Sequence, residues 1–213
     1  MNKIISKRNF RNVDGKIILS PLSLLVLAAC SGGSGGKIGE DDGDYDRGGN
    51  LNKGPLKDAL VFLDYEPNDT LDPGEPFVRS GADGSFSITG SSLYPNARTV
   101  AITDESTIDT SSGTVLAGVT LSAPATASVV SLASTLIDKS NGTITEAQLQ
   151  EILGFDPSDN IDLLNFNPFA VENEGTLARD LEVASQQLGA VLTSVTASAT
   201  AAGLSSADAF TES

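Results

Sequence analysis

The strongest candidate for a chemical role is an acidic stretch of twelve residues, 64–75, in which oxygen-bearing side chains recur at regular spacing. Counted from its first residue, positions 1, 3, 5, 7, 9 and 12 are Asp64, Glu66, Asn68, Thr70, Asp72 and Glu75. Calcium takes about six to eight hard oxygen ligands, and a loop of this length can wrap such ligands around one point. The spacing therefore predicts a structural calcium site.

The order of ligands is that of an EF-hand loop, with the apolar Leu71 at position 8. Thr70 would contribute its carbonyl, Glu75 two oxygens, and Asp72 a direct or water-bridged contact. Position 6, which is normally a left-handed Gly, is Asp69, and Pro67 stiffens the loop. We therefore expect weak affinity, with Kd about 10⁻⁴–10⁻³ M. A polar turn between two strands is the alternative interpretation.

Composition excludes several other kinds of chemistry. The 213 residues contain no His, no Trp and a single Cys, which leaves no His-dependent nucleophile, no His-ligated metal and no internal disulfide. The formal net charge of −15 argues against a nucleic-acid partner. Paired carboxylates are common in glycosidases, but three Tyr and no Trp offer little for an aromatic cleft. We therefore expect a non-enzymatic protein without catalytic or cofactor-binding residues other than the calcium ligands.

The N-terminus has the features of a secretory signal over residues 1–29. Five basic residues precede an apolar run, 17–29, that is too short to span a membrane as a helix. The run ends in Leu27-Ala28-Ala29-Cys30, which resembles the lipobox of bacterial lipoproteins. This resemblance implies that Cys30 becomes a lipidated N-terminus, and the lack of Asp after it resembles outer-membrane sorting. An ordinary signal with a chance Cys is the alternative.

Residues 30–50 read as a lipidated Cys followed by a flexible, acidic, Gly-rich tether. Without residues 1–29 the chain has 8 basic and 27 acidic residues, a net charge of −19 that favours solubility and attracts cations.

The calcium loop lies within a region that reads as β structure, residues 51–123. Apolar or alternating segments at 59–63, 85–89, 98–102 and 114–121 are separated by turn residues, which favours a small antiparallel sandwich. From Pro124 the period changes to that of helices. Val129 and Val130 begin one apolar helical face. Thr145 opens a capping box before a second helix, which ends at Gly154. An apolar stripe from Leu177 to Val195 predicts a long third helix packed on other helices. The fold class is therefore α+β, with an Ig-like or prealbumin-like sandwich followed by a helical unit at 124–213.

Three segments of the β region resemble the SdrD B-like domains of bacterial surface adhesins: Gly54–Asp64, the loop end Gly74–Pro76, and Ala82–Phe86. Those domains are calcium-binding, prealbumin-like sandwiches, so the resemblance implies the same fold here and calcium at the 64–75 loop. Asn68-Asp69 departs from the pattern at a place where the family usually has Gly. Residues 124–200 look like the segment that follows such domains in large secreted bacterial proteins.

These observations predict a lipid-anchored protein of the cell envelope, exposed at the outer membrane, with a structural or adhesive role. Its partners would be the membrane, through the lipid, and a surface protein or glycan of unknown identity. The alternative is a carbohydrate- or peptide-binding accessory module of a larger secreted system. That reading needs exposed aromatic residues, and Tyr65, Tyr94 and Phe77 are the candidates.

Overall fold

The computed structural model describes residues 43–159 and 161–201, all of which fall in one compact unit, 42–213. The predicted signal, Cys30 and most of the predicted tether lie outside the described residues. The strands are β1 (Asp44–Asn52), β2 (Leu56–Lys57), β3 (Leu60–Asp64), β4 (Phe77–Arg79), β5 (Ser85–Ser91), β6 (Arg98–Ile102), β7 (Ile108–Asp109), β8 (Thr114–Val115), β9 (Thr120–Ala123) and β10 (Val129–Ser131). The helices are α2 (Leu132–Lys139), α3 (Glu146–Ile152) and α4 (Thr176–Ala201), with 3-10 turns η1 (Pro157–Asp159) and η2 (Val171–Asn173).

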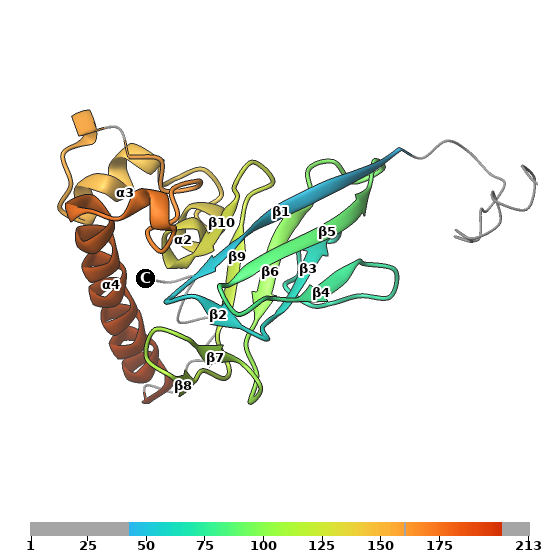
Figure 1. Ribbon diagram of the computed structural model, residues 1–213, viewed down its shortest axis with the longest axis horizontal. Coiled ribbons are helices and arrows are strands. Elements are labelled where there is room, and N and C mark those ends of the chain that lie inside the picture. Colours follow the sequence, from blue (N-terminus) through green and yellow to red (C-terminus); the bar gives the residue numbers. More distant parts are fainter. Residues whose placement is uncertain (1–42, 160, 202–213) are drawn as a thin grey trace, which may run out of the picture. The chain divides into compact units, whose positions relative to one another are not determined.

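Within the described residues the strands form three sheets, in the orders β10-β1-β5, β2-β7-β8 and β4-β3-β6-β9 (Figure 1). All neighbouring strands are antiparallel except β1 and β10, which are parallel. The chain is thus mixed α+β, and its β part is compatible with the small sandwich expected from the sequence.

The main core lies between the β10-β1-β5 and β4-β3-β6-β9 sheets. Alternation along β5 buries Phe86 and Ile88 on one face and exposes the serines and threonine between them. Val61 and Leu63 of β3 join them in one buried cluster. Because Phe62, between these two, is also fully buried, β3 is covered on both faces, which explains its unbroken apolar sequence.

Strand β1 corrects the predicted tether, since residues 44–50 belong to the sheet. The low apolar content of this segment concealed the strand. Gly49 is required there: a Cβ would lie 2.3 Å from the Ser128 carbonyl oxygen and 2.8 Å from the Phe86 ring. The small residue lets β10 and the core approach the strand closely.

Two further boundaries differ from those expected. The predicted strand at 114–121 is interrupted, with β8 and β9 placed in different sheets and Gly118 at φ +76° between them. Val129 and Val130 form β10 and not the start of a helix, because they pair with β1. Helix α2 begins directly after β10, whose last residue, Ser131, is the N-cap and accepts a hydrogen bond from the backbone N–H of Ser134.

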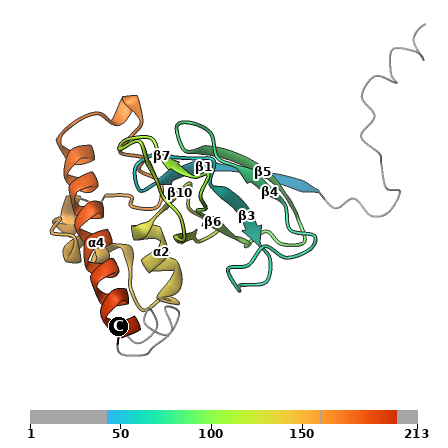
Figure 2. The same cartoon turned by 90° about the horizontal axis from the view of Figure 1, so that it is seen from below.

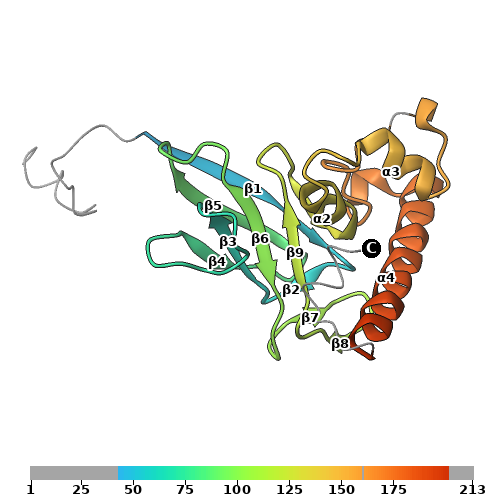
Figure 3. The ribbon, with the colours of Figure 1, turned by 180° about the vertical axis from the view of Figure 1, so that it is seen from behind.

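The helices form a second core. Thr145 and Gln148 make the expected capping box of α3, and Gly154, at φ +85°, follows its end. Leu149, Leu163 and Leu181 pack together from α3, the following loop and α4. The expected stripe along α4 is buried only in part, because Leu177 and Val191 are exposed. The side chain of Val195, the last residue of the expected stripe, lies outside the described ones. Figure 3 shows α2 between β9 and α4, and Figure 2 shows α2 beside α4 from another side.

Candidate functional site

The predicted loop begins at the last residue of β3. Asp64 lies opposite Arg98, the first residue of β6, in the antiparallel register. Its side chain is buried, with the residue 1% exposed. One carboxylate oxygen, Oδ2, pairs with the Arg98 guanidinium and accepts the backbone N–H of Asp69 at 3.1 Å. The other, Oδ1, is buried and has no hydrogen-bond partner.

Asp69, at the sixth position of the loop, has the left-handed conformation (φ +60°) that a Gly normally provides. Its carboxylate is held on both sides, by Arg98 at 2.9 Å and by the Lys139 ammonium from the end of α2. Burial raises the pKa of Asp69, but the hydrogen bonds and charges of Lys139 and Arg98 outweigh it and bring the pKa below its usual value. These ion pairs offset part of the strain that the conformation imposes on a side chain with a Cβ.

Glu75 closes the other end of the loop. The residue is 8% exposed, and its carboxylate accepts the backbone N–H of Tyr65 at 2.6 Å and that of Asp72 at 2.9 Å. The last predicted ligand therefore lies against the segment next to the first one, and both are buried. This is how a twelve-residue loop brings its ends together.

The middle of the loop is more exposed. Asn68 donates to the Asp72 carboxylate at 2.7 Å and accepts the backbone N–H of Thr70 at 2.7 Å. Glu66 is exposed. Among residues 43–159 and 161–201, no three acidic side chains converge as a group that could hold a metal. The structure thus gathers Asn68, Asp72 and Glu75 by hydrogen bonds and places Asp64 with Arg98.

Arg98 is the residue of the candidate site that the sequence analysis did not predict. Its guanidinium also binds the Asp138 carboxylate of α2 at 2.8 Å, and Ser122 donates to the same carboxylate at 2.6 Å. Burial lowers the pKa of Arg98, but the neighbouring Asp138, Asp64 and Asp69 outweigh this effect and raise the pKa above its usual value, so the guanidinium stays charged. The sequence did contain a signal for this pair, because an acid directly after one predicted strand and a base at the start of another are natural cross-strand partners.

The charges at the loop do not balance. Residues 64–75 contain five carboxylates, and two cations, Arg98 and Lys139, pair with them. Arg98 also forms an ion pair with Asp138, which lies outside the loop. An excess of negative charge therefore remains around hard oxygen donors, one of which is buried and unpaired.

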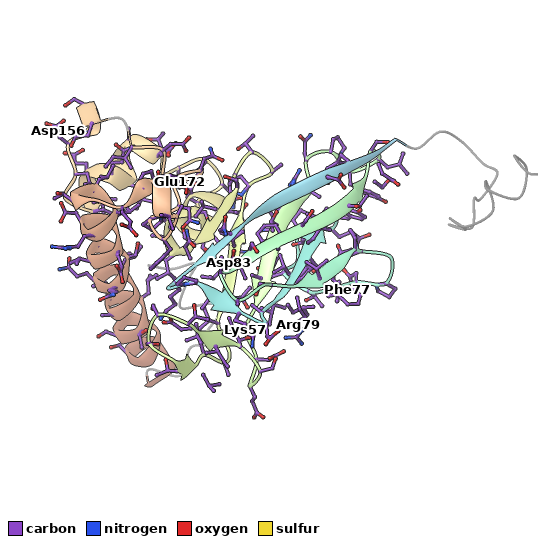
Figure 4. The ribbon with its side chains drawn as sticks, in the orientation of Figure 1. Lys57, Phe77, Arg79, Asp83, Asp156 and Glu172 are labelled. Carbon is purple, nitrogen blue, oxygen red and sulfur yellow. The ribbon has the colours of Figure 1, made fainter. Side chains whose placement is uncertain are left out.

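The three tyrosines of the chain meet beside the loop. The Tyr65 and Tyr94 rings stack with centroids 4.0 Å apart and planes 8° from parallel, and the Tyr45 hydroxyl donates to the Tyr94 carbonyl at 2.9 Å. Burial, the main cause, raises the pKa of Tyr45. Tyr94 is partly exposed, whereas Phe77 lies on the edge strand β4 and is 60% exposed (Figure 4). The stack does not include Phe77, since Tyr65 and Tyr94 are the one stacked pair in the described part of the chain.

Comparison of the chain with protein families, with curated protein sequences and with solved structures gives no match. In the part of the chain that the structure describes, none of the helices combines the length and apolar character needed to cross a bilayer.

Proposed function

We propose that this is a non-enzymatic lipoprotein of the bacterial cell envelope, anchored in the outer membrane through Cys30 and exposed at the cell surface. In this proposal a prealbumin-like sandwich, stabilised by calcium at the 64–75 loop, has a structural or adhesive role toward a surface protein or glycan. The sequence Leu27-Ala28-Ala29-Cys30 supports the anchor.

One observation carries the calcium part of the proposal: the loop has a left-handed residue at position 6 and a buried, unpaired carboxylate oxygen at position 1. An unpaired buried carboxylate oxygen is costly, and a hard cation is the partner that would satisfy it. The residues that would hold the ion are Asp64, Glu66, Asn68, Thr70, Asp72 and Glu75. Their carboxylate, amide and carbonyl oxygens fit calcium, and the excess negative charge of the loop favours a divalent cation.

Calcium in this proposal acts on stability. The ion would connect the end of β3 to the middle of the loop by shared coordination. In that middle part Glu66 is exposed, and the Asp72 carboxylate accepts a side-chain hydrogen bond from Asn68. At ten times its Kd it would add about 1.4 kcal/mol to the free energy of unfolding. For a folded unit of this size that corresponds to a rise in Tm of about 3–6 °C.

Thermal unfolding in calcium and in EDTA tests whether the ion stabilises the fold. The calcium concentration should be about 10 mM, because the expected affinity is weak. The matched pair of variants is Glu75→Gln, in the loop, and Glu105→Gln, an exposed acid outside it. We expect the calcium-dependent rise in Tm in the original chain and in Glu105→Gln, and its loss in Glu75→Gln. Equal Tm values with and without calcium in the original chain would show that the loop is an ordinary turn.

The anchor has its own test. Labelling of growing bacteria with palmitate should mark the original chain and leave Cys30→Ser unlabelled. Cys30→Ser should also leave the membrane fraction. A labelled Cys30→Ser variant would contradict the assignment of this residue.

The stacked tyrosines support a second candidate, a carbohydrate- or peptide-binding accessory module. Tyr94 retains exposed ring surface beside the stack, and aromatic faces of this kind bind apolar ligand surfaces. A glycan-array signal that is lost in Tyr94→Ala and kept in Phe77→Ala would favour this function over a purely structural one.

A further inference from the structure

A cavity of about 500 Å³ lies between the end of β1, the start of α2 and helix α4. This volume is in the range of small-molecule sites. The cavity shares no lining residue with the 64–75 loop. Its apolar wall is formed by Val129, Ala133, Leu163, Phe166, Phe169 and Leu181.

Glycines bring the walls close to one another. At Gly189 of α4, a Cβ would lie 3.2 Å from the Leu132 side chain and 4.0 Å from the Lys53 side chain. Gly54, at φ +79°, fixes the turn after Lys53, and a Cβ there would meet the Asp109 carboxylate at 2.2 Å. Lys53 is thus held at the cavity between a fixed turn and the face of α4.

Lys53 is the one cationic side chain of the lining, and it has no acidic partner. Within residues 43–159 and 161–201, no carboxylate is at ion-pair distance from its ammonium. The lining acid, Glu182, is hydrogen-bonded to Gln186 at 3.3 Å. A positive charge without a partner in a mainly apolar cavity is the arrangement that recognises an anionic head group.

Asn52, next to Lys53, also lines the cavity and sets a limit on where an anionic group can lie. Asn167 Oδ1 accepts the backbone N–H of Phe169 at 2.9 Å, so Asn52 must present its amide NH₂ to that oxygen, which it does at 3.1 Å. The Asn52 carbonyl oxygen is then left buried without a partner. Buried amide oxygens are normally satisfied, and a carboxylate has no proton to donate to this one, so Lys53 and not Asn52 is the residue of this wall that can bind an anionic group.

We propose that this cavity binds a small amphiphile with an aliphatic body and a single carboxylate, such as a fatty acid. The apolar wall receives the chain, and Lys53 pairs with the carboxylate. One cation, with Glu182 nearby and a net charge of −15 on the whole protein, disfavours a phosphate with two charges. This inference does not depend on calcium binding or on lipidation.

The experiment measures binding of dodecanoate and dodecanol to the full chain in detergent-free buffer, by displacement of a dansyl-labelled undecanoic acid. We expect saturable binding with one site per chain. Lys53→Met, which keeps the aliphatic stem, should weaken dodecanoate about tenfold, as loss of a charged hydrogen bond does, and leave dodecanol unchanged. Ser185→Phe, which fills the cavity from α4, should abolish both, and Gln187→Phe, on an exposed position outside the lining, should change neither.

Each opposite result overturns the proposal. These results are the absence of saturable binding, dodecanoate binding that is the same in Lys53→Met, or binding that survives in Ser185→Phe. Ala190→Leu replaces Ser185→Phe if the latter lowers Tm, because Ala190 also lines the cavity. Binding that appears only after removal of residues 202–213 would show that the chain itself fills the cavity, which also excludes the proposal.

Discussion

Replacement of Arg98 by Met should destabilise the protein more than any other change of a charged residue described above. The substitution keeps the aliphatic volume and removes a guanidinium that is 16% exposed in its side chain. It leaves the Asp64 and Asp138 side chains, 0% and 5% exposed, without their counter-charge. Removal of one partner from a buried ion pair costs about 3–5 kcal/mol, because the other charge stays buried.

That cost is a large fraction of the 5–15 kcal/mol typical of a folded domain. For a unit of about this size, each kcal/mol lowers Tm by roughly 2–4 °C, so we expect a decrease of about 6–20 °C. Chemical and thermal unfolding followed by circular dichroism give both quantities. Calcium should restore more stability to this variant than to the original chain, because the loop has lost a positive charge.

Arg79→Met is the matched control for Arg98→Met. Arg79 pairs with Asp104 at 2.7 Å, and both side chains are more than 40% exposed. Exposed pairs contribute about 0–1 kcal/mol, so the control should be nearly neutral. If Arg98→Met cost less than about 1 kcal/mol, or as little as the control, the reasoning on buried charge would be refuted.

Three further predictions use the same unfolding assays. Gly49→Ala should lower the free energy of unfolding by about 1–3 kcal/mol, because the new Cβ would overlap Ser128 and Phe86. Gly48→Ala is the control and should cost much less, since its Cβ would meet its nearest neighbour at 3.5 Å. Equal effects of the two substitutions would contradict the packing argument. Ser131→Ala should cost about 0.5–2 kcal/mol by loss of the N-cap of α2, and an unchanged unfolding midpoint would be incompatible with that role. Asp69→Asn should destabilise the protein at neutral pH. Because the folded pKa of Asp69 is lowered, its contribution is complete above the unfolded value of about 3.9 and decreases as pH falls below that value. A difference between the two proteins that does not decrease over this range would exclude the ion pairs as its cause.

Local patterns predicted the elements that depend on neighbouring residues. The period-two sequence of β5, the capping box of α3 and the glycine after it are all where the sequence places them, because turn and cap chemistry is decided within a few residues. Strand β1 and strand β10 were missed for the opposite reason. Each exists because a distant segment pairs with it, and their own residues, glycines in one case and a valine pair in the other, are compatible with several structures.

The spacing of oxygen-bearing residues in the 64–75 loop predicted a left-handed residue at position 6, which the structure has at Asp69. That Asp69 can adopt this conformation was not readable, since it depends on Arg98 and Lys139, which lie 29 and 70 residues away in sequence. Electrostatic partners across a sheet and a helix are set by tertiary packing. The calcium ligands themselves remain a prediction.

The sequence predicts a boundary between a sandwich and a helical unit at residues 123 and 124. In the structure, hydrogen bonds join strand β9, before this boundary, to helix α2, after it. Both backbone groups of Ser122 in β9 are bonded by α2: Thr135 accepts its N–H at 2.9 Å, and Ser134 donates to its C=O at 2.8 Å. Helix α2 thereby covers polar groups of an edge strand, which would otherwise invite pairing with another chain.

The same helix contacts the 64–75 loop directly through Lys139, which pairs with Asp69, and indirectly through Asp138, which pairs with Arg98. A change in charge at the loop, such as the entry of a cation, therefore acts on ion pairs that α2 contributes. Because α2 also packs against α4, the loop and the helices have a direct physical connection within one folded unit. It follows that stability measured at the loop and stability measured in the helices should change together.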